Sequence, residues 1–268
     1  MPLAVCATPI GNLADVTLRV LDELAAADTV LCEDTRHTRG LLQRHGIEAR
    51  LLSYHQHNEA TRTAELIPRL VAGERMALVS DAGLPGVNDP GARLVVASIA
   101  AGVPVTVLPG ASAVETALVA SGLAGEQYRF VGYLPRKAGE LAALWEEIGS
   151  VSYPVVAFES PRRLGSSLAS LAELAPDRPV AVCRELTKMF EEVVRGTASE
   201  LADRFTEEPK GEITLVIGAP TGEPPLPIDV AAAAVAELVA AGAPRRVAAE
   251  VVARLAGTSR NRLYRSSL

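Results

Sequence analysis

The chain has 268 residues, of which 49% are hydrophobic and 22% charged, and its formal net charge is −6. These fractions exclude a disordered chain and a coiled coil. No apolar run approaches the roughly 18 residues that a membrane span requires, and the first residues lack the basic region of a secretion signal. We therefore expect a soluble, cytoplasmic protein with room for two lobes and a small appendage.

The first 120 residues alternate short β-rich runs with helical patterns, which predicts a parallel sheet flanked by helices. Helices are expected after Thr17, over Ala60–Val71 and over Ala92–Ala101. The expected strands are Leu3–Ala7, Thr29–Cys32, Arg50–Ser53, Met76–Ser80 and Pro104–Leu108.

A second α/β pattern begins after Gly122–Gly125. Towards its end the order of elements changes. A strand over Lys188–Val194 is followed by Gly196, one short helix and then another strand. This order predicts antiparallel pairing in the second sheet. The expected strands are Arg129–Gly132, Pro154–Phe158, Pro179–Arg184, Lys188–Val194 and Glu212–Ile217, and the expected helices are Ala138–Ile148, Arg162–Leu174 and Ser199–Phe205.

The last part of the chain follows a stretch rich in Pro and Gly at 218–227, which marks a boundary. Three short helices are expected there, over Asp229–Ala241, Arg245–Leu255 and Ser259–Ser267, and they resemble a helix-turn-helix. A small helical cap on the second lobe is the alternative. We therefore expect an N-terminal lobe (1–121), a C-terminal lobe (122–219), a linker (220–228) and a basic helical module (229–268).

The end of the chain is basic although the whole chain is acidic: residues 244–268 hold six arginines and one acid. The planar guanidinium binds phosphate well, which favours nucleic-acid contact. A solvated helical face would give the same composition, so this alternative stays open.

Several common motifs are missing. Neither the dinucleotide pattern G-x-G-x-x-G nor the P-loop occurs, and residues 110–114 lack the final glycine of G-x-S-x-G, so these enzyme classes are disfavoured. Cys6, Cys32 and Cys183 have no C-x-x-C spacing, which argues against disulfides and a zinc ribbon. His55 and His57 could share one strand face, but no cysteine is near, and we expect no metal.

Four unusual segments follow predicted strands, where open α/β sheets bind ligands. They are residues 7–13 (ATPIGNL), 33–39 (EDTRHTR), 80–91 (SDAGLPGVNDPG) and 108–113 (LPGASA). Each also has a purely structural interpretation. The first could be an ordinary turn, Asp34 or Thr35 could cap a helix, Asp89–Pro90 could start one, and Ser112 with Glu115 has capping-box spacing.

The chain resembles the ribosomal RNA small subunit methyltransferase I family, a branch of the tetrapyrrole methylase-like fold. The resemblance lies in the order of ATPIGNLAD, CEDTRHTRGLL, SYHQHNE, VSDAGLPGVNDPG, LPGASA, LPRK, ESPRRL, CRELTKMFEE, RGT and KGEITLVIG. It implies two α/β lobes with an inter-lobe cleft for S-adenosylmethionine, a homodimer, and 2′-O-methylation of cytidine 1402 in 16S rRNA of the small ribosomal subunit. The superfamily's Gly-Asp-Pro loop is Ser80-Asp81-Ala82 here, which weakens the alternative of a tetrapyrrole substrate.

Site residues follow from the resemblance and from the first loop. The candidate cofactor contacts are Pro9, Gly11, Ser80, Asp81, Ala82, Gly83, Pro109, Gly110, Ala111, Ser112, Ala113, Phe158, Ser160, Leu186, Thr187, Gly211 and Glu212. A base for the ribose hydroxyl is sought among Asp34, His37, Glu159 and Glu185. Candidate RNA contacts are Arg36, Arg39, Arg162, Arg163, Arg245, Arg246, Arg260 and Arg262, each of which could also be a surface charge. A non-catalytic RNA-binding assembly factor is a further alternative.

Overall fold

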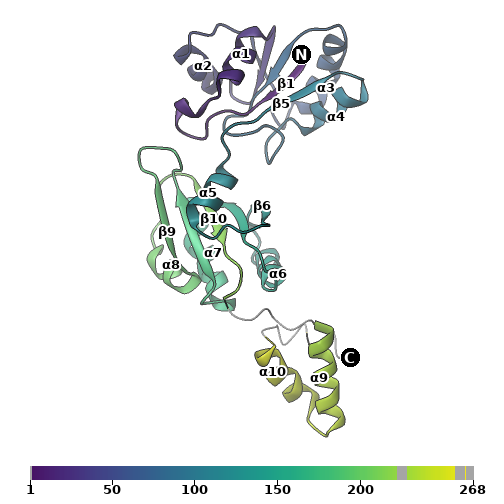
Figure 1. Ribbon diagram of the computed structural model, residues 1–268, viewed down its shortest axis with the longest axis vertical. Helices are drawn as coiled ribbons and strands as arrows, with labels where there is room; N and C mark the ends of the chain where they lie inside the picture. The colour runs from purple at the N-terminus through teal and green to yellow at the C-terminus, as the bar shows by residue number, and fades with distance from the viewer. Residues whose placement is uncertain (1, 222–227, 257–262, 264–268) are drawn as a thin grey trace. The chain divides into compact units, whose positions relative to one another are not determined.

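The structure is a computed structural model that describes residues 2–221, 228–256 and 263 (Figure 1). It divides into two units. Unit 1 comprises Met1–Thr116 and Glu185–Glu191, and unit 2 comprises Ala117–Arg184 and Glu192–Leu268. The first boundary falls inside helix α5 (Ala113–Ser121), and the chain returns once to unit 1 through Glu185–Glu191. The domain limits expected from the sequence stay predictions.

Unit 1 holds a five-stranded sheet in the order β3-β2-β4-β1-β5. Every pairing in it is parallel, which confirms the predicted parallel sheet. The strands consist largely of β-branched and other apolar residues, as expected where both faces are covered. They are β1 (Leu3–Cys6), β2 (Thr29–Cys32), β3 (Leu51–Ser53), β4 (Met76–Leu78) and β5 (Val105–Leu108).

Helices cover both faces of this sheet. Alternate residues of β1 point to opposite faces, so Ala4 and Cys6 pack with Val20 and Leu24 of α1, whereas Leu3 packs with residues of α3 and α4. The helices are α1 (Leu18–Ala26), α2 (Thr35–Arg44), α3 (Glu59–Val71) and α4 (Ala92–Ala100), and a short 3-10 turn spans Leu13–Asp15.

Helix α4 begins at Ala92, as the expected range Ala92–Ala101 predicts, but Asp89–Pro90 does not start it. The N-cap is Gly91, with φ of 137°, a left-handed value that favours glycine. A Cβ at this position would lie 2.8 Å from Cδ2 of Leu78. The close approach of Gly91 to the core therefore sets where the helix can begin.

Unit 2 holds a second five-stranded sheet, in the order β6-β7-β10-β8-β9. β6 pairs with β7 in parallel and the other pairings are antiparallel, which confirms the predicted mixture. Helices α6, α7 and α8 pack on one face, and the C-terminal half of α5 contacts the other (Figure 1). The elements are β6 (Arg129–Tyr133), α6 (Ala138–Ile148), β7 (Val155–Glu159), α7 (Pro161–Leu174), β8 (Pro179–Arg184), β9 (Glu192–Thr197), α8 (Ala198–Arg204) and β10 (Ile213–Ile217).

The strand expected over Lys188–Val194 was placed too early. β9 begins at Glu192 and continues through Gly196 to Thr197, which pairs with Pro179 of β8. The residues before it form a turn, because Glu185 and Thr187 have left-handed φ values of 52° and 66°. Propensity alone did not reveal this reversal of the chain.

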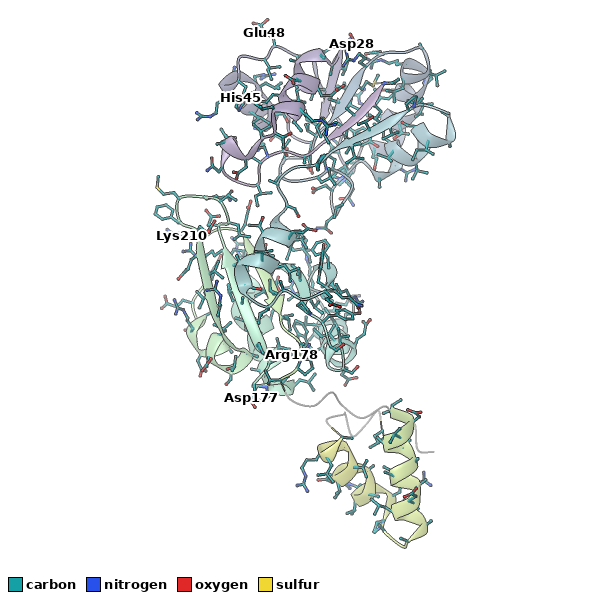
Figure 2. All side chains as sticks on the ribbon, in the orientation of Figure 1. Asp28, His45, Glu48, Asp177, Arg178 and Lys210 are labelled. Atoms are coloured by element: carbon teal, nitrogen blue, oxygen red, sulfur yellow. The ribbon has the colours of Figure 1, made fainter. Side chains whose placement is uncertain are left out.

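Arg178 holds together three chain turns of unit 2. It is buried beside the start of β8, and its guanidinium donates to the carbonyl oxygens of Gly218 (2.6 Å), Ile148 (3.2 Å) and Gly149 (3.3 Å) (Figure 2). Burial lowers its pKa to about 10.

The described part of the basic module contains α9 (Ile228–Ala240) and α10 (Arg245–Leu255). They pack through small apolar residues, among them Ala231, Val235, Ala249 and Val252. The expected third helix, with Arg260 and Arg262, lies outside the described residues except for Leu263, as does most of the expected linker. In the described ranges, no helix is both long enough and apolar enough to cross a membrane.

Candidate functional site

The four segments singled out from the sequence meet at one edge of unit 1. Each follows a parallel strand, so all lie at the carboxyl edge of the same sheet. β1 and β4 are neighbours there, but the chain leaves β1 towards α1 on one face and β4 towards α4 on the other. Open α/β sheets usually bind their ligand at this place, where the chain leaves two neighbouring strands towards opposite faces of the sheet.

The loops after β1 and β4 are joined through their backbones. The amide of Thr8 donates to the carbonyl of Gly83 over 2.8 Å, and the amide of Gly83 donates back over 3.0 Å. The hydroxyl of Thr8 donates to the carbonyl of Ser80 over 3.0 Å, and the Ser80 hydroxyl donates to Gly83 over 3.2 Å. Thr8 and Ser80 are buried, so their polar groups are satisfied inside the junction.

The loop after β5 approaches the same junction where glycines leave room. A Cβ at Gly110 would lie 2.8 Å from Cβ of Ala7, and one at Gly83 would lie 3.7 Å from the carbonyl oxygen of Ala111. Gly83 also has a left-handed φ of 77°. Small side chains and peptide groups therefore line this edge, and Ala82 and Gly110 are exposed on it.

Helix α5 begins directly after this loop. Ser112 contacts the side chain of Glu115, and the Thr116 hydroxyl donates to the carbonyl of Ser112 over 2.6 Å. Pro109 is exposed, whereas Ala111, Ser112 and Ala113 are half-buried. The predicted cofactor residues of this segment thus lie at the amino end of a helix, where unpaired amides favour anionic groups.

Three carboxylates also face this edge: Glu33, Asp81 and Asp89. Burial, followed by the negative charges of Glu33 and Asp81, raises the pKa of Asp89 to about 6. Burial and Asp81 likewise raise the pKa of Glu33. Glu33 and Asp89 were missed as site residues, although both follow strand ends in the segments that the sequence singled out.

The connection Glu185–Glu191 brings two more predicted residues to unit 1. The Thr187 hydroxyl accepts a hydrogen bond from the amide of Asn12 over 3.0 Å, and Leu186 is buried. A Cβ at Gly11 would lie 3.1 Å from the carbonyl of Leu186. Pro9 is buried in the same loop as Gly11, so the segment 7–12 is held from two sides.

Three candidate bases lie in unit 1. Asp34 caps α2, and its carboxylate accepts bonds from the amide and guanidinium of Arg36, each at 2.8 Å. These bonds hold the pKa of Asp34 far below its usual range, which makes it a weak base. Glu185 pairs with Lys188 at 3.0 Å, and His37 is exposed on α2.

The fourth candidate base, Glu159, is buried at the end of β7 in unit 2. It accepts hydrogen bonds from the Ser167 hydroxyl (2.5 Å) and the Ser160 amide (2.7 Å) and pairs with Arg163 at 3.3 Å. Arg163 also donates to the carbonyls of Leu134 (3.1 Å) and Pro135 (2.5 Å). These contacts connect the start of α7 with the end of β6. Glu159 and Arg163 therefore both stabilise this part of unit 2.

The other predicted residues of unit 2 share this edge. Ile213 at the start of β10 pairs with Glu159, which places Gly211 and Glu212 beside the end of β7. Phe158 packs against Phe130, with ring centroids 5.0 Å apart. Thus the predicted cofactor residues form two groups, one in each unit.

The predicted RNA contacts are spread over several elements. Arg36 and Arg39 are exposed on α2, and Arg162 is exposed on α7, 3.6 Å from Glu208. Arg245 and Arg246 begin α10.

The two histidines considered for a metal lie close together, with ring centroids 5.9 Å apart. The described residues contain no group of three or more His, Cys, Asp or Glu side chains that could hold a metal ion.

Comparison with known proteins places these features in a family. Residues 2–202 match the family described as Tetrapyrrole (Corrin/Porphyrin) Methylases. A protein of Mesorhizobium japonicum named Ribosomal RNA small subunit methyltransferase I is 45% identical over 99% of this chain and 91% of its own length. A protein of the same name from Micromonospora olivasterospora is 45% identical over 96% of this chain and 83% of its own.

Solved structures show the same fold. Uroporphyrin-III C-methyltransferase from Thermus thermophilus aligns over 81% of this chain and 93% of its own, with a TM-score of 0.56 and 24% identity. A structure of a uroporphyrin-III C-methyltransferase from Thermus thermophilus complexed with S-adenyl homocysteine aligns over 80% of this chain and 96% of its own, with a TM-score of 0.55 and 19% identity.

Proposed function

Because the chain belongs to the ribosomal RNA small subunit methyltransferase I branch of the tetrapyrrole methylases, we propose that it methylates the ribose 2′-oxygen of cytidine 1402 in 16S rRNA. The enzyme transfers a methyl group from S-adenosylmethionine to rRNA. The position and the oxygen are the proposed part. The observation that carries the proposal is the backbone-lined, acidic edge of unit 1.

The residues at this edge fit the donor. S-adenosylmethionine supplies a methyl group on a sulfonium whose positive charge disappears as the methyl leaves. Side chains of Glu33 and Asp81 provide negative potential without a tight ion pair, and the glycine and alanine loops present peptide groups at close range. A side chain at position 110 would collide with Ala7. The residues here must therefore stay small, which leaves their peptide groups accessible to the donor.

The ribose hydroxyl must also lose its proton. Among the acidic groups at the unit 1 edge, Asp89 is the best matched acceptor, because a pKa of about 6 lies close to neutral pH. Asp34 is held by Arg36 and is a poor acceptor. His37 and Glu185 stay candidates, and Glu159 would have to leave its three partners to act. We expect these residues to contribute more to the rate by holding the hydroxyl near the donor than by accepting its proton.

We further propose that the substrate is the assembled small ribosomal subunit, that the enzyme works as a homodimer and that it is cytoplasmic. The arginine-rich basic module would add phosphate contacts to those of the exposed arginines on α2 and α7. Removing residues 228–268 should then weaken binding to the subunit and leave donor binding unchanged.

The decisive experiment incubates labelled S-adenosylmethionine with small subunits that lack the modification and maps the label. We expect one 2′-O-methylated cytidine. A methyl on a base, or transfer only to a tetrapyrrole, would replace the proposed reaction, and RNA binding without transfer would indicate an assembly factor.

A variant tests the assigned edge. Asp81→Ala should weaken donor binding, measured by calorimetric titration. Asp22→Ala, on the exposed side of α1, is the matched control and should bind the donor like the wild type. Equal donor affinity in all three proteins would remove Asp81 from the site.

A further inference from the structure

Three aromatic side chains gather at the edge strand β6 of unit 2, in a chain with one Trp, five Tyr and four Phe. The ring of Phe158 on β7 contacts those of Phe130 (5.0 Å) and Tyr133 (5.5 Å), both edge-on. Phe130 and Phe158 are half-buried, whereas Tyr133 is 63% exposed. Tyr133 thus presents a large aromatic surface to solvent while its partner supports it from behind.

A β-bulge puts Tyr133 in this position. Phe130 pairs with Val156 and Tyr133 with Phe158, so two residues of β6 stand opposite one residue of β7. Gly132 in the bulge has a left-handed φ of 70°. Because a regular strand would turn residues 130 and 133 to opposite faces, the extra residue is what brings both rings onto Phe158.

The backbone after Tyr133 is fixed as well. The amide of Leu134 donates to the carbonyl of Phe158 over 3.0 Å. Arg163 holds the carbonyls of Leu134 and Pro135 and is itself paired with Glu159. The surface is therefore ordered before any partner arrives, which lowers the entropy cost of binding.

Two cations follow directly, Arg136 and Lys137, and both are exposed. Lys137 lies 2.8 Å from Glu140, but their side chains are 80% and 57% exposed. Such surface pairs contribute little free energy, so the ammonium can exchange Glu140 for a phosphate.

We infer that the segment Tyr133–Lys137 binds an unpaired stretch of the RNA substrate, with Tyr133 stacking on a base and Arg136 and Lys137 contacting phosphates. An exposed ring beside cations is the usual combination for single-stranded RNA, since rings stack on bases while cations hold the backbone. Protein interfaces are also rich in Tyr and Arg, but they are depleted in Lys, which a phosphate backbone favours. The inference rests on the proposed function, because it requires RNA as the substrate.

The first test replaces the ring. Tyr133→Ala should weaken binding to unmodified small subunits about tenfold, whereas Tyr133→Phe should retain wild-type affinity because it keeps the ring. Donor affinity, measured by calorimetry, and the unfolding temperature should stay close to wild type in both variants. A loss of donor affinity with unchanged subunit affinity would overturn the inference and assign Tyr133 to the donor.

The second test removes the cations. The double variant Arg136→Ala/Lys137→Ala should bind the subunit more weakly and lower the slope of log affinity against log salt by about two. Arg44→Ala is the matched control, because Arg44 ends α2 and therefore lies towards the opposite edge of the unit 1 sheet. An unchanged slope in the double variant would contradict the phosphate contacts.

The outcomes separate this inference from the proposed function. If the wild type neither binds nor methylates the subunit, the proposed function fails. If the wild type methylates normally and the variants match it, only the surface assignment fails. A change of oligomeric state in Tyr133→Ala, measured by sedimentation, would instead assign the surface to a second copy of the chain.

Discussion

The backbone amide of Asn12 donates a hydrogen bond to the hydroxyl of Thr187 over 3.0 Å, although 175 positions separate the two residues. The neighbouring Gly11 makes this approach possible. A Cβ at position 11 would lie 2.5 Å from Cγ of Lys188 and 2.8 Å from Oγ1 of Thr187. The connection between β8 and β9 therefore closes on the loop after β1 only while residue 11 has no side chain.

Gly11→Ala should weaken donor binding severalfold, because the Cβ pushes the connection Glu185–Glu191 away from the loop after β1. Calorimetric titration with S-adenosylmethionine measures the effect. Gly40→Ala is the control: no atom lies within 4 Å of its added Cβ, and it should stabilise α2 by up to about 1 kcal/mol. Wild-type donor affinity in Gly11→Ala would show that this contact does not shape the site.

Glu159→Ala should lower the free energy of unfolding by about 3 kcal/mol, because it leaves the half-buried Arg163 without its carboxylate. Urea unfolding measures the loss. Ser167→Ala, which removes one donor from the same carboxylate, should cost about 1 kcal/mol. If Glu159→Gln instead unfolds like the wild type but has lost kcat with unchanged donor affinity, Glu159 is the base and not a structural group.

Arg178→Met should destabilise unit 2 by about 3 kcal/mol, because the carbonyls of the buried residues Ile148 and Gly218 and of the exposed Gly149 lose their charged donor. Arg178→Lys should recover only part of this, since an ammonium lacks the planar fork. The control is Arg204→Ala, whose exposed ion pair with Glu192 contributes less than about 1 kcal/mol. Thermal unfolding compares the three variants, and an equal loss for Arg178→Met and Arg204→Ala would contradict the anchoring role.

Asp89 should give the stability a distinct pH dependence. Its pKa is raised from 3.8 to about 6 in the folded protein, so between these pH values the folded state holds more protons than the unfolded state. The contribution of Asp89 to the free energy of unfolding therefore falls as pH rises through this window and is constant above it.

Asp89→Asn should remove this slope and raise the stability at pH 7.5 by about 1 kcal/mol, a value discounted for the solvent that reaches the side chain. Urea unfolding at several pH values measures it. If Asp89 also accepts the proton, kcat of the variant should fall. The pH dependence of kcat should then also lose its midpoint near pH 6. A variant that keeps the wild-type slope of stability with pH would refute the raised pKa.

Much of the fold was readable from local patterns. The parallel sheet of unit 1 followed from apolar runs alternating with amphipathic helices, and its ligand loops followed from glycine, proline and acids placed after strands. The errors came where local pattern carries no information. β9 began later than expected because Glu185 and Thr187 turn the chain. The start of α4 at Ala92 was predicted, but its N-cap is Gly91, which packs against Leu78, and not Asp89 or Pro90.

The residue types, their order along the chain and their family were determined by the sequence itself, because periodicity and motif spacing are local properties. The roles of individual charged groups were decided only in three dimensions. Glu159 and Arg163 stay predicted as a base and an RNA contact, and the fold adds that they pair with each other and that Arg163 donates to the carbonyl of Leu134. Asp89 read as a helix start, yet desolvation beside Glu33 and Asp81 gives it a pKa of about 6. Burial and charge depend on residues far apart in the chain, and only the folded arrangement brings these together.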